Sequence, residues 1–219
     1  MTDKNSSGLL PDEGCSAVMG SNLLSFFVDV TREDKRFIKN SMRWAEYKAD
    51  LRLDRKREPA AWFEYYSGVM WSVGWRLDHA PVIVSDKDFF GDVLDAWAKS
   101  LSAQLSREKV RRMKETFQML ELDSNGVEIF TNSTRKWGDF RFSPASYNLH
   151  KELEIVISNV RLLSSEWFST YLFWTVKHEG SQLDIQSRRF VITPDQIEKY
   201  REQLSLAVVE MRLGEIELA

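Results

Sequence analysis

Three histidines and one cysteine are the side chains of this sequence best suited to metal binding or nucleophilic catalysis. His79, His150 and His178 each stand alone next to a predicted turn, with no second histidine or cysteine at the spacing of metal ligands. A zinc site needs three or four such ligands, so we expect turn histidines in solvent and no metal site. Cys15 lies among glycine, serine and two acidic residues, which disfavour the thiolate that a catalytic cysteine needs. We therefore expect no cysteine nucleophile.

Pairs of acidic residues are the next candidates, because some acid–base enzymes use two carboxyl groups. Asp92 with Asp95, and Glu152 with Glu154, have the spacing expected of solvated faces. The sequence also has no G-x-S-x-G nucleophile elbow and no glycine-rich phosphate loop. We assign no catalytic residue and no cofactor, and a non-enzymatic protein is favoured. A small hydrolase or transferase with an unrecognised site stays an alternative, and it requires a deep pocket with polar side chains from different segments.

The charge of the chain argues against a nucleic acid partner. The formal net charge is -3 and the pI is about 5.7. Basic runs at 55–57 and 109–114 are interleaved with or followed by acidic residues. Both runs are predicted to be solvated helix faces.

Composition predicts a compact protein that fits a reducing compartment or is indifferent to redox state. The 219 residues are 43% hydrophobic and 29% charged, which is typical of globular domains. The single cysteine cannot form a disulfide within the chain. No apolar run approaches the roughly 20 residues of a membrane-spanning helix, and the first residues lack the pattern of a Sec signal. We expect a cytoplasmic protein, and export without a cleavable signal stays open.

Residues 166–176 are the strongest strand candidate of the chain. Nearly every residue there is β-branched, aromatic or aliphatic, and neither alternating set is charged. A strand of this kind buries both faces, so it is predicted to lie at the centre of a sheet that helices cover on both sides.

Four helices are predicted before residue 122. Thr31, Ser85 and Ser106 are the expected N-caps of the first, third and fourth helix. The second helix, 60–77, follows Pro59 and is apolar almost all round, so it should be buried or lie against another chain. Its glycines predict a tight crossing with another backbone.

The second half of the chain predicts a sheet and a last helix. Turns are expected at 123–126 and 143–148, a hairpin at 178–181, and strands at 127–130, 140–142, 153–160, 167–177 and 183–192. Thr193 and Pro194 begin an amphipathic helix, 194–213, and the final EIEL segment is expected to pair with a sheet edge. The predicted fold is α+β: a flexible arm, 1–21, and a single domain, 22–219, in which a helical part, 31–122, packs on an antiparallel sheet of about five strands, 127–192.

The leading functional hypothesis is a non-enzymatic protein-interaction or assembly subunit. It rests on the absent motifs and on an aromatic content of 12%. A protein partner or self-association is expected through Trp71 and Trp75, with Trp44 and Trp137 as secondary candidates. The first alternative is a membrane-active, toxin-like protein that exposes the tryptophan-rich second helix.

Overall fold

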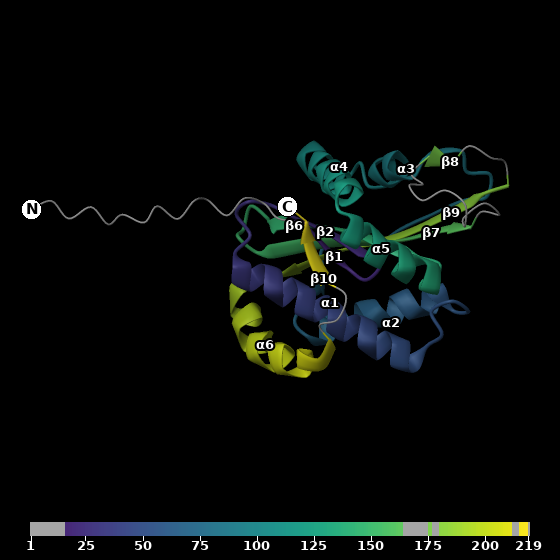
Figure 1. Ribbon diagram of the computed structural model, residues 1–219. Coiled ribbons are helices and arrows are strands. Elements are labelled where there is room, and N and C mark those ends of the chain that lie inside the picture. The colour runs from purple at the N-terminus through teal and green to yellow at the C-terminus, as the bar shows by residue number, and fades with distance from the viewer. Residues whose placement is uncertain (1–15, 164–174, 177–179, 212–214, 219) are drawn as a thin grey trace, which may run out of the picture.

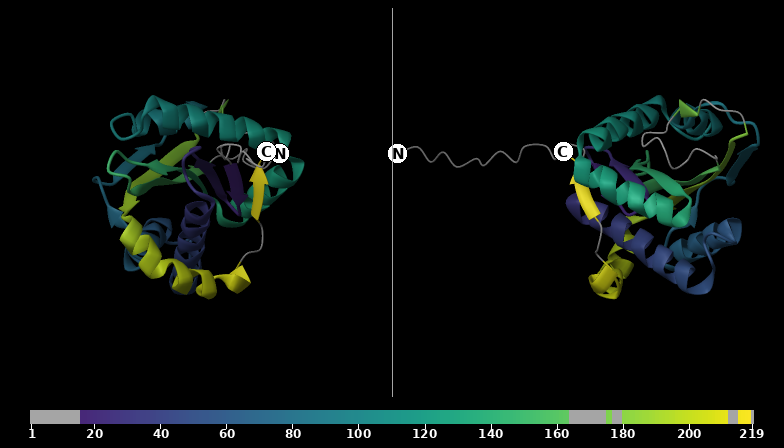
Figure 2. Two further views of the ribbon diagram at one scale, coloured as in Figure 1. Left: turned by 90° about the vertical axis from the view of Figure 1, so that its left-hand side faces the viewer. Right: turned by 45° about the vertical axis from the view of Figure 1, so that its right-hand side comes forward.

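The computed structural model describes residues 16–163, 175–176, 180–211 and 215–218. A mixed β-sheet lies between two layers of helices, which confirms the α+β class (Figures 1 and 2). The helices are α1 (Arg32–Arg52), α2 (Pro59–Ser72), α3 (Val93–Ser100), α4 (Arg107–Leu122), α5 (Ser124–Trp137), α6 (Pro194–Ala207) and the short 3-10 helix η1 (Val209–Met211). The strands are β1 (Ser16–Met19), β2 (Asn22–Phe26), β3 (Arg76–Leu77), β4 (Val82–Asp86), β5 (Gly91–Asp92), β6 (Phe140–Tyr147), β7 (Leu153–Leu163), β8 (Thr175–Val176), β9 (Gln182–Ile192) and β10 (Glu215–Leu218).

The main sheet has eight strands in the order β10-β1-β2-β6-β7-β9-β3, and β4 also pairs with β9. Neighbouring strands are antiparallel except β2 and β6, which are parallel. The sheet is mostly antiparallel, as predicted, but it has eight strands rather than about five and contains one parallel pair. The parallel pair is possible because the chain passes through α1 to α5 between β2 and β6, and parallel strands need a long crossover.

The two faces of the sheet bury two apolar clusters. Ile155 and Ile157 of β7 belong to the cluster that α1, α2 and α6 cover. Val156 and Val160 belong to the cluster that α3, α4 and α5 cover. Successive side chains of a strand point to opposite faces, so a strand between two helical layers is apolar on both sides.

Two of the three predicted hydroxyl caps are confirmed. The Thr31 side chain accepts a hydrogen bond from the Asp34 amide at 3.2 Å, and the Ser106 side chain accepts one from the Lys109 amide at 3.3 Å. The prediction for Ser85 is wrong, since this residue lies in β4. The α3 cap is Asp92, whose carboxylate accepts from the Asp95 amide at 2.8 Å.

The segment 123–137 differs most from the sequence prediction. We expect a turn at 123–126 and then a strand at 127–130, but these residues begin α5. The Asp123 carboxylate accepts from the Gly126 amide at 2.8 Å and caps the helix. Phe130 and Thr134 then lie buried one turn apart. The helical part therefore extends beyond residue 122, and the sheet includes strands from both halves of the chain.

Three predicted strands of the second half of the chain are present, and each is longer than expected. Strands β6, β7 and β9 confirm the segments at 140, 153 and 183, but β6 runs through the predicted turn at 143–148 and contains Pro144. The α6 helix begins at Pro194 as predicted, although the Thr193 side chain makes no capping hydrogen bond.

The two glycines of the predicted second helix do not mark a crossing with another helix backbone. A Cβ atom on Gly68 would have no neighbour within 4 Å. Gly74 lies beyond the end of the helix with φ +95, and a Cβ there would come within 2.9 Å of the Tyr200 side chain. The close approach is therefore between the turn after α2 and a side chain of α6, not between two helix backbones.

The first and last described strands, β1 and β10, pair with each other in the sheet. The predicted arm ends earlier than residue 21, because β1 is a buried strand between β2 and β10. The predicted pairing of the EIEL segment is confirmed, since β10 pairs with β1. Most of the predicted central strand, 166–176, lies outside the described residues, as do Cys15 and His178. Its end forms β8, which pairs with β5 in a separate two-stranded sheet.

Candidate interaction surface

The four tryptophans expected at an interface lie in different environments. Trp75 is fully buried and its ring lies 6.0 Å from the ring of Phe37, so it is a core residue and is no longer an interface candidate. Trp44 and Trp137 are half-buried. Trp71 has an exposed fraction of 74%, so it is the candidate that the fold leaves free to contact a partner.

Trp71 lies on the side of α2 that faces one edge of the sheet. Ala60, Glu64 and Trp71 fall within about 40° of one another on the helix circumference. Ala60 lines a cleft together with Ile83 of β4. Glu64 forms an ion pair with Arg188 of β9. This side of α2 therefore lies towards the outer strands β9 and β4.

The outer side of β4 is an open sheet edge. β4 pairs with β9 through residues 82–86, and its other side pairs with no strand of the described chain. Ile83 has an exposed fraction of 69% and Val84 one of 36%. Edge strands are usually protected by charges, bulges or a covering element, because their free N–H and C=O groups can pair with another chain. The centre of β4 instead carries exposed β-branched side chains.

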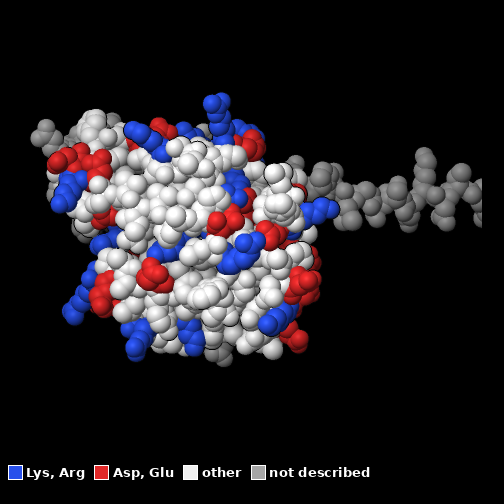
Figure 3. Space-filling model, turned by 180° about the vertical axis from the view of Figure 1, so that it is seen from behind, with Lys and Arg blue, Asp and Glu red and all other residues white. Residues whose placement is uncertain are grey.

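Exposed apolar side chains extend from β4 to the end of α2. Leu77 pairs with Phe190 of β9, which belongs to the core on the α2 side, so Leu77 faces this side as well. Val84 pairs with Ile185 and points to the other face of the sheet. We call Trp71, Leu77, Ile83, Val84 and the open side of β4 the edge surface. Figure 3 shows the face of the molecule opposite to β10, and a broad area of it carries no charged side chain.

The sequence contained part of this signal. The APVIV segment is β-branched, and we interpret it from the sequence as a short strand or a connector. Because a helix is expected to begin at Ser85, the sequence does not predict that β4 continues through Ser85 to Asp86. Exposure of Ile83 could not be predicted, because it depends on which strand lies at the end of the sheet order.

A buried cluster of charges and aromatic rings joins α1, α2 and the sheet. Arg55 is 1% exposed, donates through Nε to Asp139 at 3.0 Å and through Nη1 to Glu46 at 2.8 Å, and lies 4.4 Å from the centre of the Trp62 ring. Arg141 is fully buried and donates to the same Glu46 oxygen at 2.9 Å. The prediction that 55–57 is a solvated basic run is thus wrong for Arg55.

The two arginines dominate the acidity of Glu46. Burial by itself raises the pKa of this carboxyl group, but the positive charges of Arg141 and Arg55 and their hydrogen bonds outweigh it and lower the pKa to about 2. The same cluster buries Tyr66, where burial raises the pKa of the phenol far above its usual range. Glu46 is therefore charged at neutral pH, and the cluster is held together by ion pairs.

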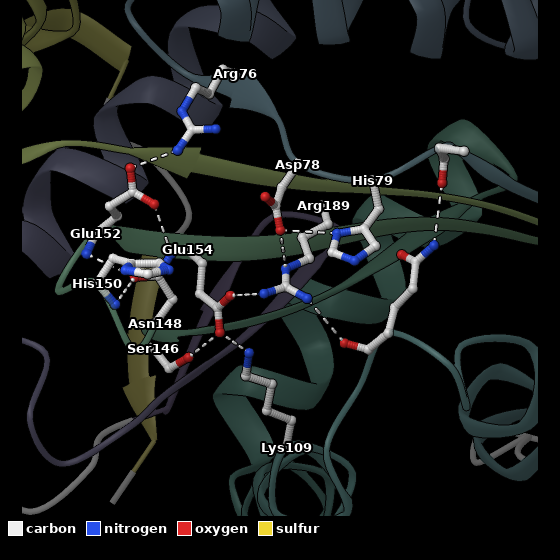
Figure 4. A network of polar contacts seen from close by, with 12 residues as sticks. Arg76, Asp78, His79, Lys109, Ser146, Asn148, His150, Glu152, Glu154 and Arg189 are labelled. Carbon is white, nitrogen blue, oxygen red and sulfur yellow. Dashed lines mark hydrogen bonds and ion pairs between the residues drawn. The ribbon is translucent and has the colours of Figure 1, made fainter.

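A second polar network surrounds Glu154 (Figure 4). Glu154 is 3% exposed and accepts hydrogen bonds from Ser146 at 2.8 Å, from Arg189 at 2.6 Å and from Lys109. Arg189 also forms an ion pair with Asp78 at 3.2 Å. The network ties α4 to β6, β7 and β9. The predictions that Glu154 and Lys109 lie on solvated faces are wrong, because each neutralises the other in the interior.

The Glu154 network contains a histidine but no complete catalytic set. His79 Nδ1 lies 2.9 Å from Asp78, as in a base oriented by a carboxylate (Figure 4). The Ser146 hydroxyl, however, donates to Glu154, and no hydroxyl or thiol of the described residues is paired with His79. His79 and His150 are exposed in turns, as the sequence predicts. This network acts as a structural connection.

Two open clefts carry polar side chains. The first, of about 490 Å³, lies beside α6, and its charged groups are largely paired: Arg201 donates to Asp34 and to Glu198, each at 2.9 Å. The second, of about 240 Å³, lies between the start of α2 and the sheet. Within the described chain, no group of three or more His, Cys, Asp and Glu residues is placed to hold a metal ion.

Comparisons with known proteins give weak likenesses. The sequence matches no family model and no curated protein. A solved structure titled "DELTA-ENDOTOXIN" has a TM-score of 0.40 and 10% identity over 80% of this chain and 84% of that chain. Another, "Structure of the Evf virulence factor", has a TM-score of 0.41 and 8% identity over 91% of this chain and 86% of that chain. TM-scores this low carry no argument about function. Among the described helices, none combines the length and apolarity needed to cross a bilayer.

Proposed function

We propose that this protein is a non-enzymatic assembly subunit that pairs with a second copy of itself through the edge surface. The observation that supports it best is the open, apolar side of β4, where Ile83 has an exposed fraction of 69%. An edge of this kind is a template for strand addition. We infer that the partner is an extended polypeptide segment, because such a segment can replace water along the whole row of free backbone groups.

The apolar centre of β4 favours a second copy as this partner. In a two-fold antiparallel pair each side chain keeps its face of the sheet, so Ile83 can lie opposite Ile83 of the second copy, and Val82 then lies opposite the second copy's Val84. Apolar side chains thus meet along the centre of a self-complementary, two-fold contact.

Pairing of this kind also buries the tryptophan of the edge surface. It joins the two sheets edge to edge, so the layers that contain α2 lie next to each other on one side. Trp71 and Leu77 face that side and lose solvent exposure together with Ile83. Aromatic residues at the centre of a contact contribute a large share of binding energy.

The composition of α2 argues against the membrane-active alternative. The sequence of α2 contains no lysine or arginine, so this helix has no charge that attracts an anionic bilayer. We infer a protein partner rather than a membrane or a nucleic acid. We also place the protein in the cytoplasm, on the composition of the sequence alone.

Light scattering of the purified full-length chain over a range of concentrations tests this proposal. We expect a dimer for the wild type and a monomer for Ile83→Lys, because a charged edge residue opposes strand pairing. Leu122→Lys is the matched control: this residue is 89% exposed at the end of α4, and the variant should remain a dimer.

Two results would overturn the proposal. One is a wild-type chain that stays monomeric at every concentration. The other is an Ile83→Lys variant that dimerises as strongly as the Leu122→Lys control. Dye release from liposomes by a monomeric wild type would support the membrane-active alternative.

A further inference from the structure

The cleft between α2 and the sheet has a floor of two rows of side chains. Residues that face each other on neighbouring antiparallel strands point to the same face of a sheet. Here the pairs across β7, β9 and β4 form the rows Asn159, Gln186, Ile83 and Arg161, Asp184, Ser85. Pro59 and Ala60, at the start of α2, form the opposing wall.

Two opposite charges lie next to each other in this floor without pairing. Arg161 and Asp184 are direct neighbours across β7 and β9. Asp184 accepts from the Ser85 hydroxyl at 2.6 Å and from the Gln182 amide at 2.9 Å. Arg161 makes no ion pair or hydrogen bond with any residue in the part of the chain that the structure describes. Among the described residues, the cleft thus presents a cation without a partner and, beside it, an anion with unused acceptor capacity.

The start of α2 supplies a second element. The side chain of Glu58, at the N-cap position, makes no capping hydrogen bond, and Pro59 has no N–H. Among the described residues, the amides of Ala60 and Ala61 therefore lack a side-chain partner, whereas the Trp62 amide donates to the Glu58 carbonyl oxygen at 2.8 Å. These amides and the helix dipole favour a negatively charged group. They lie on the wall opposite Arg161.

We propose that this cleft binds a small zwitterion of the α-amino-acid type. Its carboxylate lies between Arg161 and the first turn of α2, and its ammonium group binds Asp184. A bare anion would lie against Asp184, and a bare cation would lie against Arg161. A ligand with both charges matches both side chains, and a cleft of about 240 Å³ suits a small molecule. This inference does not depend on self-association.

The test is binding of the twenty common L-amino acids to the purified full-length chain, first by thermal shift and then by calorimetry. At least one should bind saturably. Arg161→Gln and Asp184→Asn should each weaken its binding about tenfold or more, because each removes a charge-assisted contact. Arg107→Gln, which removes an exposed arginine from the other helical layer, should leave the affinity unchanged.

Chemical variants of the ligand separate the two charges without altering the protein. The methyl ester and the N-acetyl derivative of the bound amino acid should each bind about tenfold more weakly or worse. The proposal is overturned if no amino acid binds, if Arg161→Gln and Asp184→Asn bind like Arg107→Gln, or if acetate alone binds as tightly as the amino acid.

Discussion

Replacing Arg55 by methionine should destabilise the protein far more than the same change at Arg57. Arg55 is 1% exposed and is the described partner of Asp139, which is also 1% exposed. Methionine fills much of the same volume but leaves the carboxylate of Asp139 buried without a counter-charge. Breaking a buried ion pair by removing one partner costs about 3 to 5 kcal/mol.

Arg57 provides the matched comparison two residues away. Its side chain is 86% exposed, and its ion pair with Asp54 spans 3.5 Å. An exposed pair of this kind contributes about 0 to 1 kcal/mol. Urea unfolding followed by tryptophan fluorescence measures both variants in the same way.

A double variant separates the ion pair from the packing of the side chain. Arg55→Met combined with Asp139→Leu removes both charges, so it should be more stable than Arg55→Met alone. The reasoning is refuted if Arg55→Met unfolds at the same urea concentration as Arg57→Met, or if the double variant is less stable than the single one.

Three further predictions concern single residues. The pKa of the Glu46 carboxyl group is about 2 in the folded chain, below its ordinary value of 4.5. The charged Glu46 therefore stabilises the fold fully above pH 4.5, and this stabilisation is lost as the pH falls towards 2. This loss is about 3 kcal/mol, and acid titrations of stability should show a correspondingly flatter curve for Glu46→Gln; parallel curves would contradict the shift. Trp75→Ala should lower the free energy of unfolding by about 3 to 5 kcal/mol, because Trp75 is fully buried. Trp71→Ala, measured on the monomer, should lower it by less than about 1 kcal/mol, because Trp71 is exposed. Equal losses in chemical unfolding would contradict this difference in burial. Gly138 has φ +77 at the end of α5, so Gly138→Ala should lower stability by about 1 kcal/mol, and an unchanged melting temperature would contradict a left-handed cap.

Local patterns predicted the helix starts better than the sheet. Thr31 and Ser106 cap helices where the sequence places them, because a cap is decided by residues a few positions apart. Asp123 shows the limit of this reasoning. Its carboxylate and Gly126 suit a turn as well as a helix cap. The helix places Phe130 against Phe140 of β6, and this contact between two elements is not visible in the local pattern around Asp123.

Strand order and burial of charge could not be predicted from local patterns. The position of β1 between β2 and β10 depends on residues about 200 positions apart. The runs at 55–57 and 109–114 look alike as solvated faces, yet Arg55 and Lys109 turn inwards because Asp139 and Glu154 are brought to them by the fold. A sequence pattern gives the charge of a segment but not the partner that neutralises it.

The candidate surface was predicted in part. The sequence identifies Trp71 together with three other tryptophans, and the fold leaves Trp71 the most exposed of them. The open side of β4 was not predicted, since it depends on the place of that strand in the sheet. The cleft beside it was not predicted either, because its floor combines β4 with two distant strands.

Hydrogen exchange of the β4 amides at low and high protein concentration tests the central claim most directly. The claim is that β4 pairs with β4 of a second copy. Amides in residues 82–86 that point away from β9 should exchange rapidly in dilute solution and become protected as the concentration rises, while α4 amides remain unchanged. Protection that is the same at every concentration, or that rises elsewhere but not in β4, would contradict assembly through this edge.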